Sequence, residues 1–430
     1  MASQKKKTWK DRIHAEKIRY YVFASILAGI TFISSTYAWF IGLQEVTVED
    51  FEIDIASTDS LLLSLDGENW DSTISFNKDD IYDKAYKLPN DENGKVVHPY
   101  NWPKTGIVPL STIGEMDANS SKMILYEKAS MSATPGGYKL IASRVNNYGA
   151  PVLHGEKIQR GYLAFDLFIK NFSGTHYIEE LNPRNEESVY LTYDSTVTLG
   201  SLGVEGTGIE NSVRVAFGHV GRVSAFNQDP SVITAISCTN SDDSLKGTEN
   251  YVTGICRQAS IWEPNDTQHL ESAIAWYNKS CLLRVGEDNT LKDSYIIGSS
   301  CRKIEDGTTI PTYAITKEIL AEDCVDIYDG EAYNSYDTSI VNKLIAFPYF
   351  TDSMKLQKGT DRQTLFTLAP NSITKLRIYI YLEGQDIDNY DLAAGGRQIK
   401  VNFGFTKARF DSEDEEYEGP VLEHEAEVIG

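Results

Sequence analysis

Residues 375–384 read KLRIYIYLEG, and residues 161–171 read GYLAFDLFIKN. Apolar side chains occupy every second position in both stretches, which is the pattern of a β-strand with one face buried and the other exposed. The stretches NSVRVAF at 211–217 and QIKVNFGF at 398–405 repeat this pattern. Strands of this kind typically build antiparallel sheets that stack as a sandwich, so the sequence predicts an all-β fold. The exposed positions of the 375–384 strand would be Arg377, Tyr379, Tyr381 and Glu383.

A further strand is predicted near the start of the chain. Its apolar residues change parity between Val48 and Phe51, which predicts a bulge or turn at 49–50. The leucine-rich stretch at 61–65 predicts a second, more buried strand that is closed by a turn at 66–67. The apolar positions of the first strand are Val46, Val48, Phe51, Ile53 and Ile55.

Two long regions interrupt the strand pattern. Residues 72–158 mix Pro, Gly, Asn and Lys-Asp runs and predict long loops with short strands, whereas residues 236–340 carry every cysteine. In the second region, Asp266 and Thr267 could cap a helix whose apolar residues repeat at helical spacing over 270–277. The predicted organisation is a head with an apolar segment (1–43), N-terminal strands (44–71), a loop-rich insertion (72–158), a first part of the sandwich (159–235), a cysteine-containing insertion with a helix (236–340), a second part of the sandwich (341–408) and an acidic tail (409–430).

The N-terminal region carries an uncharged, largely apolar run at residues 20–43 behind a basic head. Seven Lys and Arg side chains precede the run against two acidic ones, and positive charge stays on the cytoplasmic side during membrane insertion. The rest of the chain is therefore predicted to be exported, to the cell surface or the extracellular space. Two fates of the segment stay open. Small residues up to Ala38 fit cleavage between Ala38 and Trp39, while the whole run is long enough to remain as a transmembrane helix.

The exported part is strongly acidic. The whole chain has a formal net charge of −22, which becomes −27 without residues 1–38 because seven basic and two acidic side chains are removed. A nucleic-acid-binding surface needs clustered Lys and Arg, so the composition excludes nucleic acid as a partner. Hydrophobic residues make up 41% of the chain, which is enough for a packed core rather than a disordered tail.

All five cysteines fall within one window of the chain. In an oxidising exterior four of them could form two disulfides and leave one thiol, and the sequence does not choose among the pairings. Their spacings lack the paired Cys-x-x-Cys form of a zinc site. We interpret them as staples of the insertion, with a link between subunits through the odd cysteine as the alternative. The disulfide candidates are Cys238, Cys256, Cys281, Cys301 and Cys324.

No catalytic constellation is recognisable in the sequence. The seven histidines include no H-E-x-x-H pair, and neither a G-x-S-x-G elbow nor a glycine-rich phosphate loop occurs. We therefore predict that the protein is not an enzyme. The one cofactor considered is calcium, because Asp386, Asp388 and Asp391 follow a predicted strand and could supply oxygen ligands. A solvated turn is the simpler explanation of this loop.

The segment at 34–65, SSTYAWFIGLQEVTVEDFEIDIASTDSLLLSL, resembles the export region of the TasA/camelysin family of Gram-positive surface and biofilm-matrix proteins. Thr36, Ala38 and Phe40 match the Thr-x-Ala-x-Phe cleavage motif of that family, and a short alternating strand follows in both. RIYIYLEGQDIDN and QIKVNFGF are similar to the last two strands of the family. This chain is much longer than the small members, and its cysteines have no counterpart among them.

The resemblance implies a jelly-roll β-sandwich, export by a dedicated signal peptidase and assembly into fibres. In such fibres the new N-terminal strand of one subunit completes the sheet of the next, which is possible because an unpaired sheet edge offers free backbone donors and acceptors. Together with the strand pattern, it predicts a jelly-roll-like antiparallel sandwich with large loop and helix insertions, preceded by an N-terminal hydrophobic helix. Here the donor strand would be residues 45–56.

We predict an exported structural protein that forms part of a bacterial surface filament or extracellular matrix. Its partner would be a second copy of itself, and it would contact the membrane through residues 20–43 before or instead of cleavage. The alternative is a membrane-anchored binding or adhesion module for a carbohydrate or a host protein. Under that alternative, Trp70, Trp102 and Trp262 would supply stacking surfaces. A secreted hydrolase is the third hypothesis, and it predicts His and carboxylate side chains gathered in one cleft.

Overall fold

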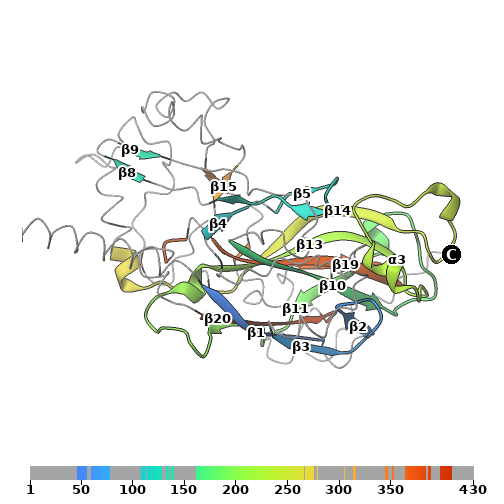
Figure 1. Ribbon diagram of the computed structural model, residues 1–430, viewed down its shortest axis with the longest axis horizontal. Coiled ribbons are helices and arrows are strands. Elements are labelled where there is room, and N and C mark those ends of the chain that lie inside the picture. The colour runs from blue at the N-terminus through green and yellow to red at the C-terminus, as the bar shows by residue number, and fades with distance from the viewer. Residues whose placement is uncertain are drawn as a thin grey trace, which may run out of the picture. The chain divides into compact units, whose positions relative to one another are not determined.

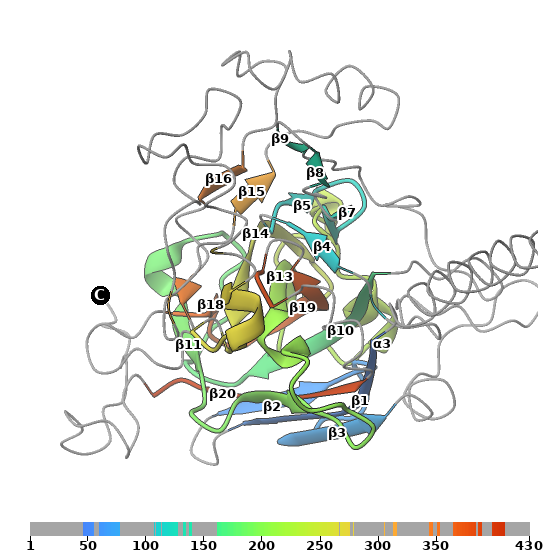
Figure 2. The same ribbon diagram turned by 90° about the vertical axis from the view of Figure 1, so that its left-hand side faces the viewer.

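Two β-sheets that pack face to face form the body of the described structure (Figure 1, Figure 2). The computed structural model describes residues 46–55, 60–77, 107, 109–112, 114–127, 132–134, 137–139, 161–265, 267–275, 278, 305, 313–315, 344–346, 351–352, 364–383, 386–388 and 398–408. The apolar run at 20–43 and the cleavage position between Ala38 and Trp39 lie outside these residues. Within the described residues, no helix has the length and apolar character needed to cross a membrane.

The larger sheet has eight strands. Its main order is β17–β14–β13–β19–β10–β2, with β4 pairing with β19 and β7 pairing with β4. The long central strands are antiparallel neighbours, and β10 pairs with β19 from Tyr162 opposite Tyr381 to Asn171 opposite Ser372. The strands are β2 (Leu61–Ser64), β4 (Pro109–Ser111), β7 (Tyr126–Glu127), β10 (Tyr162–Asn171), β13 (Val213–Ser224), β14 (Thr253–Glu263), β17 (Thr351–Asp352) and β19 (Ser372–Glu383).

The smaller sheet has six strands in the order β18–β11–β20–β1–β3, with β12 also pairing with β20. In Figure 2 its strands β20, β1 and β3 form the lower layer, below β13, β19 and β10. Most neighbouring strands are antiparallel, as predicted, but β1 with β20, β17 with β14 and β4 with β19 are parallel. The strands are β1 (Thr47–Ile55), β3 (Thr73–Asn77), β11 (Glu187–Leu191), β12 (Thr196–Leu199), β18 (Phe366–Leu368) and β20 (Gln398–Thr406).

Short elements decorate the two sheets. Residues 271–275 and 278 are helical, which confirms the predicted helix, but the helical residues begin later than the expected cap at Asp266 and Thr267. The other elements are the two-stranded sheets β5 (Met116–Asp117) with β6 (Lys122–Met123), β8 (Ser132–Thr134) with β9 (Gly137–Lys139) and β15 (Tyr313–Ile315) with β16 (Leu344–Ala346), the 3-10 turns η1 (Pro183–Asn185), η2 (Ile209–Ser212) and η3 (Asp243–Leu245), and the helix α3 (Pro230–Thr234).

The space between the two sheets is filled by the apolar residues of the alternating pattern. The four predicted strands are β10, β13, β19 and β20, and their alternate apolar side chains form one buried cluster. Phe217 of the larger sheet lies edge-on to Phe403 and Phe405 of the smaller one, with ring centroids 5.4 and 5.9 Å apart. Burying a side chain of this size contributes about 2–3 kcal/mol, so this interface provides much of the stability of the sandwich.

The outer face of the larger sheet is also buried, which corrects the prediction of an exposed face. Tyr381 and Glu383 have no exposed surface, and Tyr379 and Arg377 are 2% and 8% exposed. Residues from 110 to 125, inside the predicted loop-rich insertion, pack against this face, and the backbone N–H of Met123 donates to the Tyr379 hydroxyl at 2.8 Å. Figure 2 shows β4, β5 and β7 on the side of β19 and β10 that faces away from β1. Alternation defines the two faces of a strand but does not say what covers them.

Charged residues of this covered face form an ion cluster. The Arg377 guanidinium donates to both Asp166 carboxylate oxygens, at 2.6 and 3.0 Å, and Lys375 Nζ lies 3.2 Å from the same carboxylate. Burial alone would raise the pKa of Asp166, but Arg377 and Lys375 outweigh it and lower the pKa to about 2. The carboxylate is therefore ionised and its charge is compensated, as a buried charge must be.

Candidate functional site

The predicted donor strand is β1, and it lies inside its own smaller sheet. It runs parallel to β20, from Thr47 opposite Gln398 to Ile55 opposite Phe405, and antiparallel to β3 on its other edge. Both backbone edges of the strand therefore have partners within one chain. We refer to the position of β1 between β3 and β20 as the β1 slot.

The apolar face of β1 points into the core. Val46, Val48, Ile53 and Ile55 are at most 7% exposed and belong to the inter-sheet cluster, whereas the side chain of Phe51 lies outside the described residues. Burial of four aliphatic side chains contributes on the order of 8 kcal/mol before opposing terms, as an upper estimate. The pairing register shifts between Val48 and Phe51, which confirms the predicted bulge. An empty β1 slot would expose an apolar groove with two unpaired strand edges.

The tether of β1 to the rest of the chain is short. The next described residue after Ile55 is Ser60, which leads into β2 of the larger sheet. The intervening residues 56–59 lie outside the described residues. Leaving the β1 slot would break the pairing of β1 with β20 and β3 and the bridge between Val46 and Ile107, while no other described strand lies N-terminal to β1. The N-terminal position of β1 makes it the element of the sandwich that can be exchanged with least disruption.

The outer face of β1 carries acidic side chains. Glu52 is exposed and Asp54 is half-buried, opposite Gly404 of β20. Burial raises the pKa of Asp54, and the neighbouring Asp194 raises it further. A side chain at position 404 would collide with the Asp54 carboxylate and the Thr192 hydroxyl, so both of these groups would have to shift to make room for it. The alternating pattern of QIKVNFGF gave no signal for this close approach.

The predicted calcium loop lies at one end of β19. Asp386 and Asp388 come together there, and His269, which the sequence did not suggest, joins them with ligand-capable atoms within 4.8 Å. The His269 Nδ1 lies 2.7 Å from Asp388 Oδ2, and the other Asp388 oxygen accepts the Leu270 N–H at 2.8 Å. Asp388 thus caps the start of the helix at 271, a role that spacing along the chain could not reveal. Asp391 lies outside the described residues.

The guanidinium of Arg214 already supplies a positive charge to this network. Arg214 donates to Asp386 Oδ2 and to Glu263 Oε1, each at 2.7 Å, and Asp386 Oδ1 accepts the N–H of Asp388 at 2.9 Å. Every carboxylate oxygen of the two aspartates therefore has a protein donor or a histidine nitrogen as a partner. Calcium takes six to eight oxygen ligands, and among the described residues this loop supplies the carboxylate oxygens of Asp386 and Asp388, which are already paired. The geometry favours a polar network that fixes the loop after β19 to β13, β14 and the helix at 271.

Two histidines lie near carboxylates, as a hydrolase would require, but both are buried. The His269 side chain is 1% exposed beside Asp388, and His219 is 4% exposed near Glu186. Burial lowers the pKa of His219 to about 3, and the nearby Arg257 lowers it further, so the ring is neutral. Neither ring faces solvent from which a substrate could approach.

One disulfide is formed among the described residues. Cys238 and Cys256 are joined with a Cα–Cα distance of 4.9 Å, which links the segment after α3 to β14. Gly254 lies directly against the Cys238 carbonyl and leaves no room for a side chain. The pairing was one of those that the sequence left open. Cys281, Cys301 and Cys324 lie outside the described residues.

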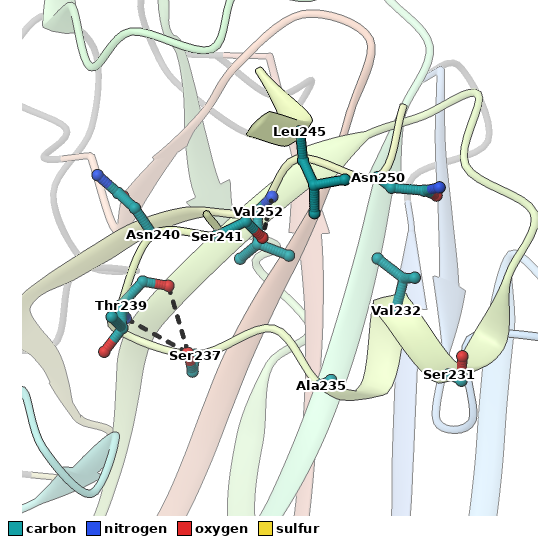
Figure 3. Close-up of a pocket in the computed structure, with 10 residues that line it drawn as sticks. All are labelled: Ser231, Val232, Ala235, Ser237, Thr239, Asn240, Ser241, Leu245, Asn250 and Val252. Carbon is teal, nitrogen blue, oxygen red and sulfur yellow. Dashed lines mark hydrogen bonds between the residues drawn. The ribbon is translucent and has the colours of Figure 1, made fainter. Parts of the chain in front are cut away.

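Of the three tryptophans predicted as stacking surfaces, Trp70 alone is both described and partly exposed. Trp262 is completely buried in the core, Trp102 lies outside the described residues, and Trp70 is half-buried with Lys170 Nζ 5.3 Å from its ring centre. A surface hollow of about 430 Å³ lies between α3 and the segment at 237–241 (Figure 3). The described residues that line it are hydroxyl, amide and small apolar side chains, without an aromatic ring or a charge.

No protein-family model matches this chain, and no match is found among curated proteins or solved structures.

Proposed function

We propose that this protein is an exported, non-enzymatic structural protein that assembles with copies of itself into a filament or matrix on a bacterial surface. The proposal includes a jelly-roll-like arrangement of the sandwich and a hydrophobic helix before β1 that serves as a signal peptide or anchor. Assembly proceeds by exchange of β1: the strand leaves its own β1 slot and enters the β1 slot of the next copy.

The observation that carries the proposal is the position of β1. It is the first described strand of the chain and follows the predicted export segment directly. Together with the adjoining Val46 it contributes four buried side chains, and both of its edges are paired in the sheet. An exchanged strand would make the same contacts in a neighbouring copy, because the two slots are identical. Head-to-tail exchange produces an open filament when the rotation between successive copies does not close into a ring.

Two further observations support export and self-assembly. The Cys238–Cys256 disulfide suits an oxidising compartment outside the cytoplasm. The acidic charge of the chain favours solubility of the subunit before it assembles. Because the monomer fills its own β1 slot, β1 must leave that slot before it can enter another copy, and assembly should increase with protein concentration.

A cysteine pair across β1 and β20 tests the exchange. Glu52 lies opposite Asn402 in the register, so a variant with Glu52→Cys and Asn402→Cys places two thiols on the outer face. Assembled first and then oxidised, this variant should give a ladder of covalent oligomers on a non-reducing gel. Oxidised as a monomer, it should give an internal bond and fail to assemble.

The matched control joins strands that would not exchange. Thr198 lies opposite Lys400, so Thr198→Cys with Lys400→Cys links β12 to β20 within one chain and should give no ladder. Negative-stain microscopy of the secreted wild-type protein, with sequencing of its N-terminus, shows whether filaments form and where the mature chain begins. A purely internal 52–402 bond in material that has formed filaments would overturn β1 exchange.

The alternative function, a membrane-anchored module that binds a carbohydrate or a host protein, has weaker support, because Trp262 is not available as a stacking surface. An intact N-terminus on membrane-bound monomers without filaments would favour this alternative.

A further inference from the structure

An amine, an amide and a carboxylate meet at the end of the sandwich where β10, β11 and β20 come together. Lys407 follows β20, Asn171 is the last residue of β10, and Glu187 is the first residue of β11. Lys407 Nζ lies 3.3 Å from Asn171 Oδ1 and 3.3 Å from Glu187 Oε2. The Asn171 amide nitrogen donates to the same Glu187 oxygen at 2.7 Å. Each of the three groups is therefore within hydrogen-bond distance of the other two.

The amide is held in one orientation. Asn171 has no exposed surface, its Nδ2 also donates to the Ala369 carbonyl at 3.0 Å, and its Oδ1 accepts the backbone N–H of Ser173 at 3.2 Å. The side chains of Lys407 and Glu187 are 15% and 14% exposed. The amide oxygen thus faces two donors, while the amide nitrogen faces the carboxylate. This arrangement would stabilise negative charge on the oxygen and deliver a proton to the nitrogen.

We propose that Lys407 and Asn171 form an intramolecular isopeptide bond, with Glu187 as the proton-transfer group. Glu187 takes a proton from the Lys407 ammonium, and the neutral amine attacks Cγ of Asn171. The Ser173 N–H donates to the oxyanion that develops at Oδ1. Glu187 then protonates Nδ2 and the Cγ–Nδ2 bond breaks. Glu187 next takes the remaining extra proton from the Lys407 nitrogen and passes it to the departing ammonia, which leaves as ammonium. One C–N bond forms, one breaks, and the reaction needs neither an oxidant nor a reductant.

A second buried lysine shows what the reaction requires. Lys375 lies 3.2 Å from Asp166, but this acceptor is an ionised carboxylate, with its pKa lowered to about 2 and its charge held by Arg377. A carboxylate anion is a poor acyl electrophile, so no bond is expected there. Of the buried Lys375 and the partly buried Lys407, Lys407 is the one that faces a neutral amide, with a carboxylate within hydrogen-bond distance of both reacting groups.

The bond would join the two sheets. Asn171 ends a strand of the larger sheet, Lys407 follows a strand of the smaller one, and the two residues are 236 positions apart. A covalent link over so long a stretch restricts the unfolded chain and raises the unfolding temperature, on the order of 10 °C for a chain of this size.

Mass spectrometry of the reduced, full-length secreted protein tests the proposal. The mass should be about 17 Da below that of the sequence from the observed N-terminus, because one ammonia is lost. Protease digestion should also yield a branched peptide that contains Asn171 and Lys407. An unshifted mass, or a shifted mass with the two residues in separate peptides, would overturn the proposal.

Two variants probe the chemistry. Glu187→Gln keeps hydrogen-bonding groups at the site but cannot transfer the proton, and Lys407→Arg keeps the charge but removes the amine. Both should show the full sequence mass and unfold at a lower temperature than the wild type. Lys246→Arg is the matched control, because Lys246 pairs with Asp243 in an exposed ion pair without an amide, and it should retain the loss of ammonia. Retention of the branched peptide in Glu187→Gln would remove the role assigned to Glu187.

Discussion

The outer faces of the two sheets carry similar residues but have different surroundings. On the larger sheet, Asp166 and Arg377 are 2% and 8% exposed under a further layer of chain. On the smaller sheet, Glu52 is exposed and Asp54 is half-buried. The same alternation of apolar and polar residues therefore produces charges that need a partner in one sheet and charges that meet water in the other. Whether other residues pack over a face, rather than the sequence of the strand, therefore decides how strongly each charge affects the free energy of unfolding.

Removal of one partner from the covered face should have the largest effect. Asp166→Ala leaves Arg377 and Lys375 without their shared carboxylate, and an uncompensated buried charge costs about 3–5 kcal/mol. Urea unfolding followed by circular dichroism measures the loss. The triple variant Asp166→Leu, Lys375→Met and Arg377→Met replaces the whole cluster and should recover most of the stability. A triple variant as unstable as Asp166→Ala would show that packing, not charge, dominates this face.

The pH dependence of stability should distinguish the ion cluster of Asp166, Lys375 and Arg377 from the other charged groups. Asp166 has a folded pKa of about 2 against an ordinary 3.8, so its contribution is complete above about pH 4 and disappears as the pH falls towards 2. The wild type should lose about 2 kcal/mol more than the triple variant over this interval. Parallel urea titrations at pH 5 and pH 2.5 measure the difference. Equal losses in the two proteins would contradict the assignment.

On the outer face of the smaller sheet, steric crowding should affect stability more than charge does. Gly404→Ala introduces a methyl group where the Asp54 carboxylate and the Thr192 hydroxyl already lie, and overpacking of this kind costs about 1–3 kcal/mol. The double variant Gly404→Ala with Asp54→Ala relieves part of the collision and should be more stable than the single one. Thermal unfolding of the two variants gives the comparison, and no gain in the double variant would point to backbone strain in place of the contact.

The smallest effect is expected for Asp54→Asn. The folded pKa of Asp54 is raised, mainly by burial, so the ionised form slightly destabilises β1 at neutral pH and protonation removes the penalty as the pH falls through that pKa. Because the side chain is only half-buried and water screens its charge, Asp54→Asn should stabilise the protein by only a few tenths of a kcal/mol at pH 7. This pH dependence is opposite in sign to that of Asp166. A gain that persists unchanged below pH 3 would argue against an electrostatic cause.

The sequence predicted the parts of the fold that depend on local periodicity. The strands β10, β13, β19 and β20, the bulge in β1 and the helix near 271 follow from apolar spacing, which is a property of neighbouring residues. The covering of the larger sheet's outer face by residues from 110 to 125 could not be predicted, because the local pattern of KLRIYIYLEG carries no information about which distant residues pack against it. The parallel pairing of β1 with β20 likewise depends on the whole topology.

In the candidate sites, too, the sequence revealed residues that are close together in the chain but not their distant partners. Asp386 and Asp388 were found as a dense carboxylate loop, but their partners Arg214 and His269 come from segments more than 100 residues away. The group of Lys407, Asn171 and Glu187 had no local signal at all, since Asn171 and Glu187 lie on the separate strands β10 and β11 and Lys407 follows β20. Chemistry that depends on distant residues is visible only once the sheets have stacked.

The parallel register of β1 and β20 has a mechanical consequence. Thr47 pairs with Gln398 at one end and Ile55 with Phe405 at the other, so tension applied before Val46 and after Ala408 acts at opposite ends of the strand pair. The hydrogen bonds between the strands are then loaded together in shear rather than opened one by one. We expect single-molecule pulling from Val46 and Ala408 to require a higher rupture force than pulling from Val46 and Gln398, which peels the pair from one end. In a filament built by exchange of β1, tension along the fibre would enter each donated strand at its Ile55 end, and the junction would be loaded in shear when the receiving copy is held from the Gln398 end of β20.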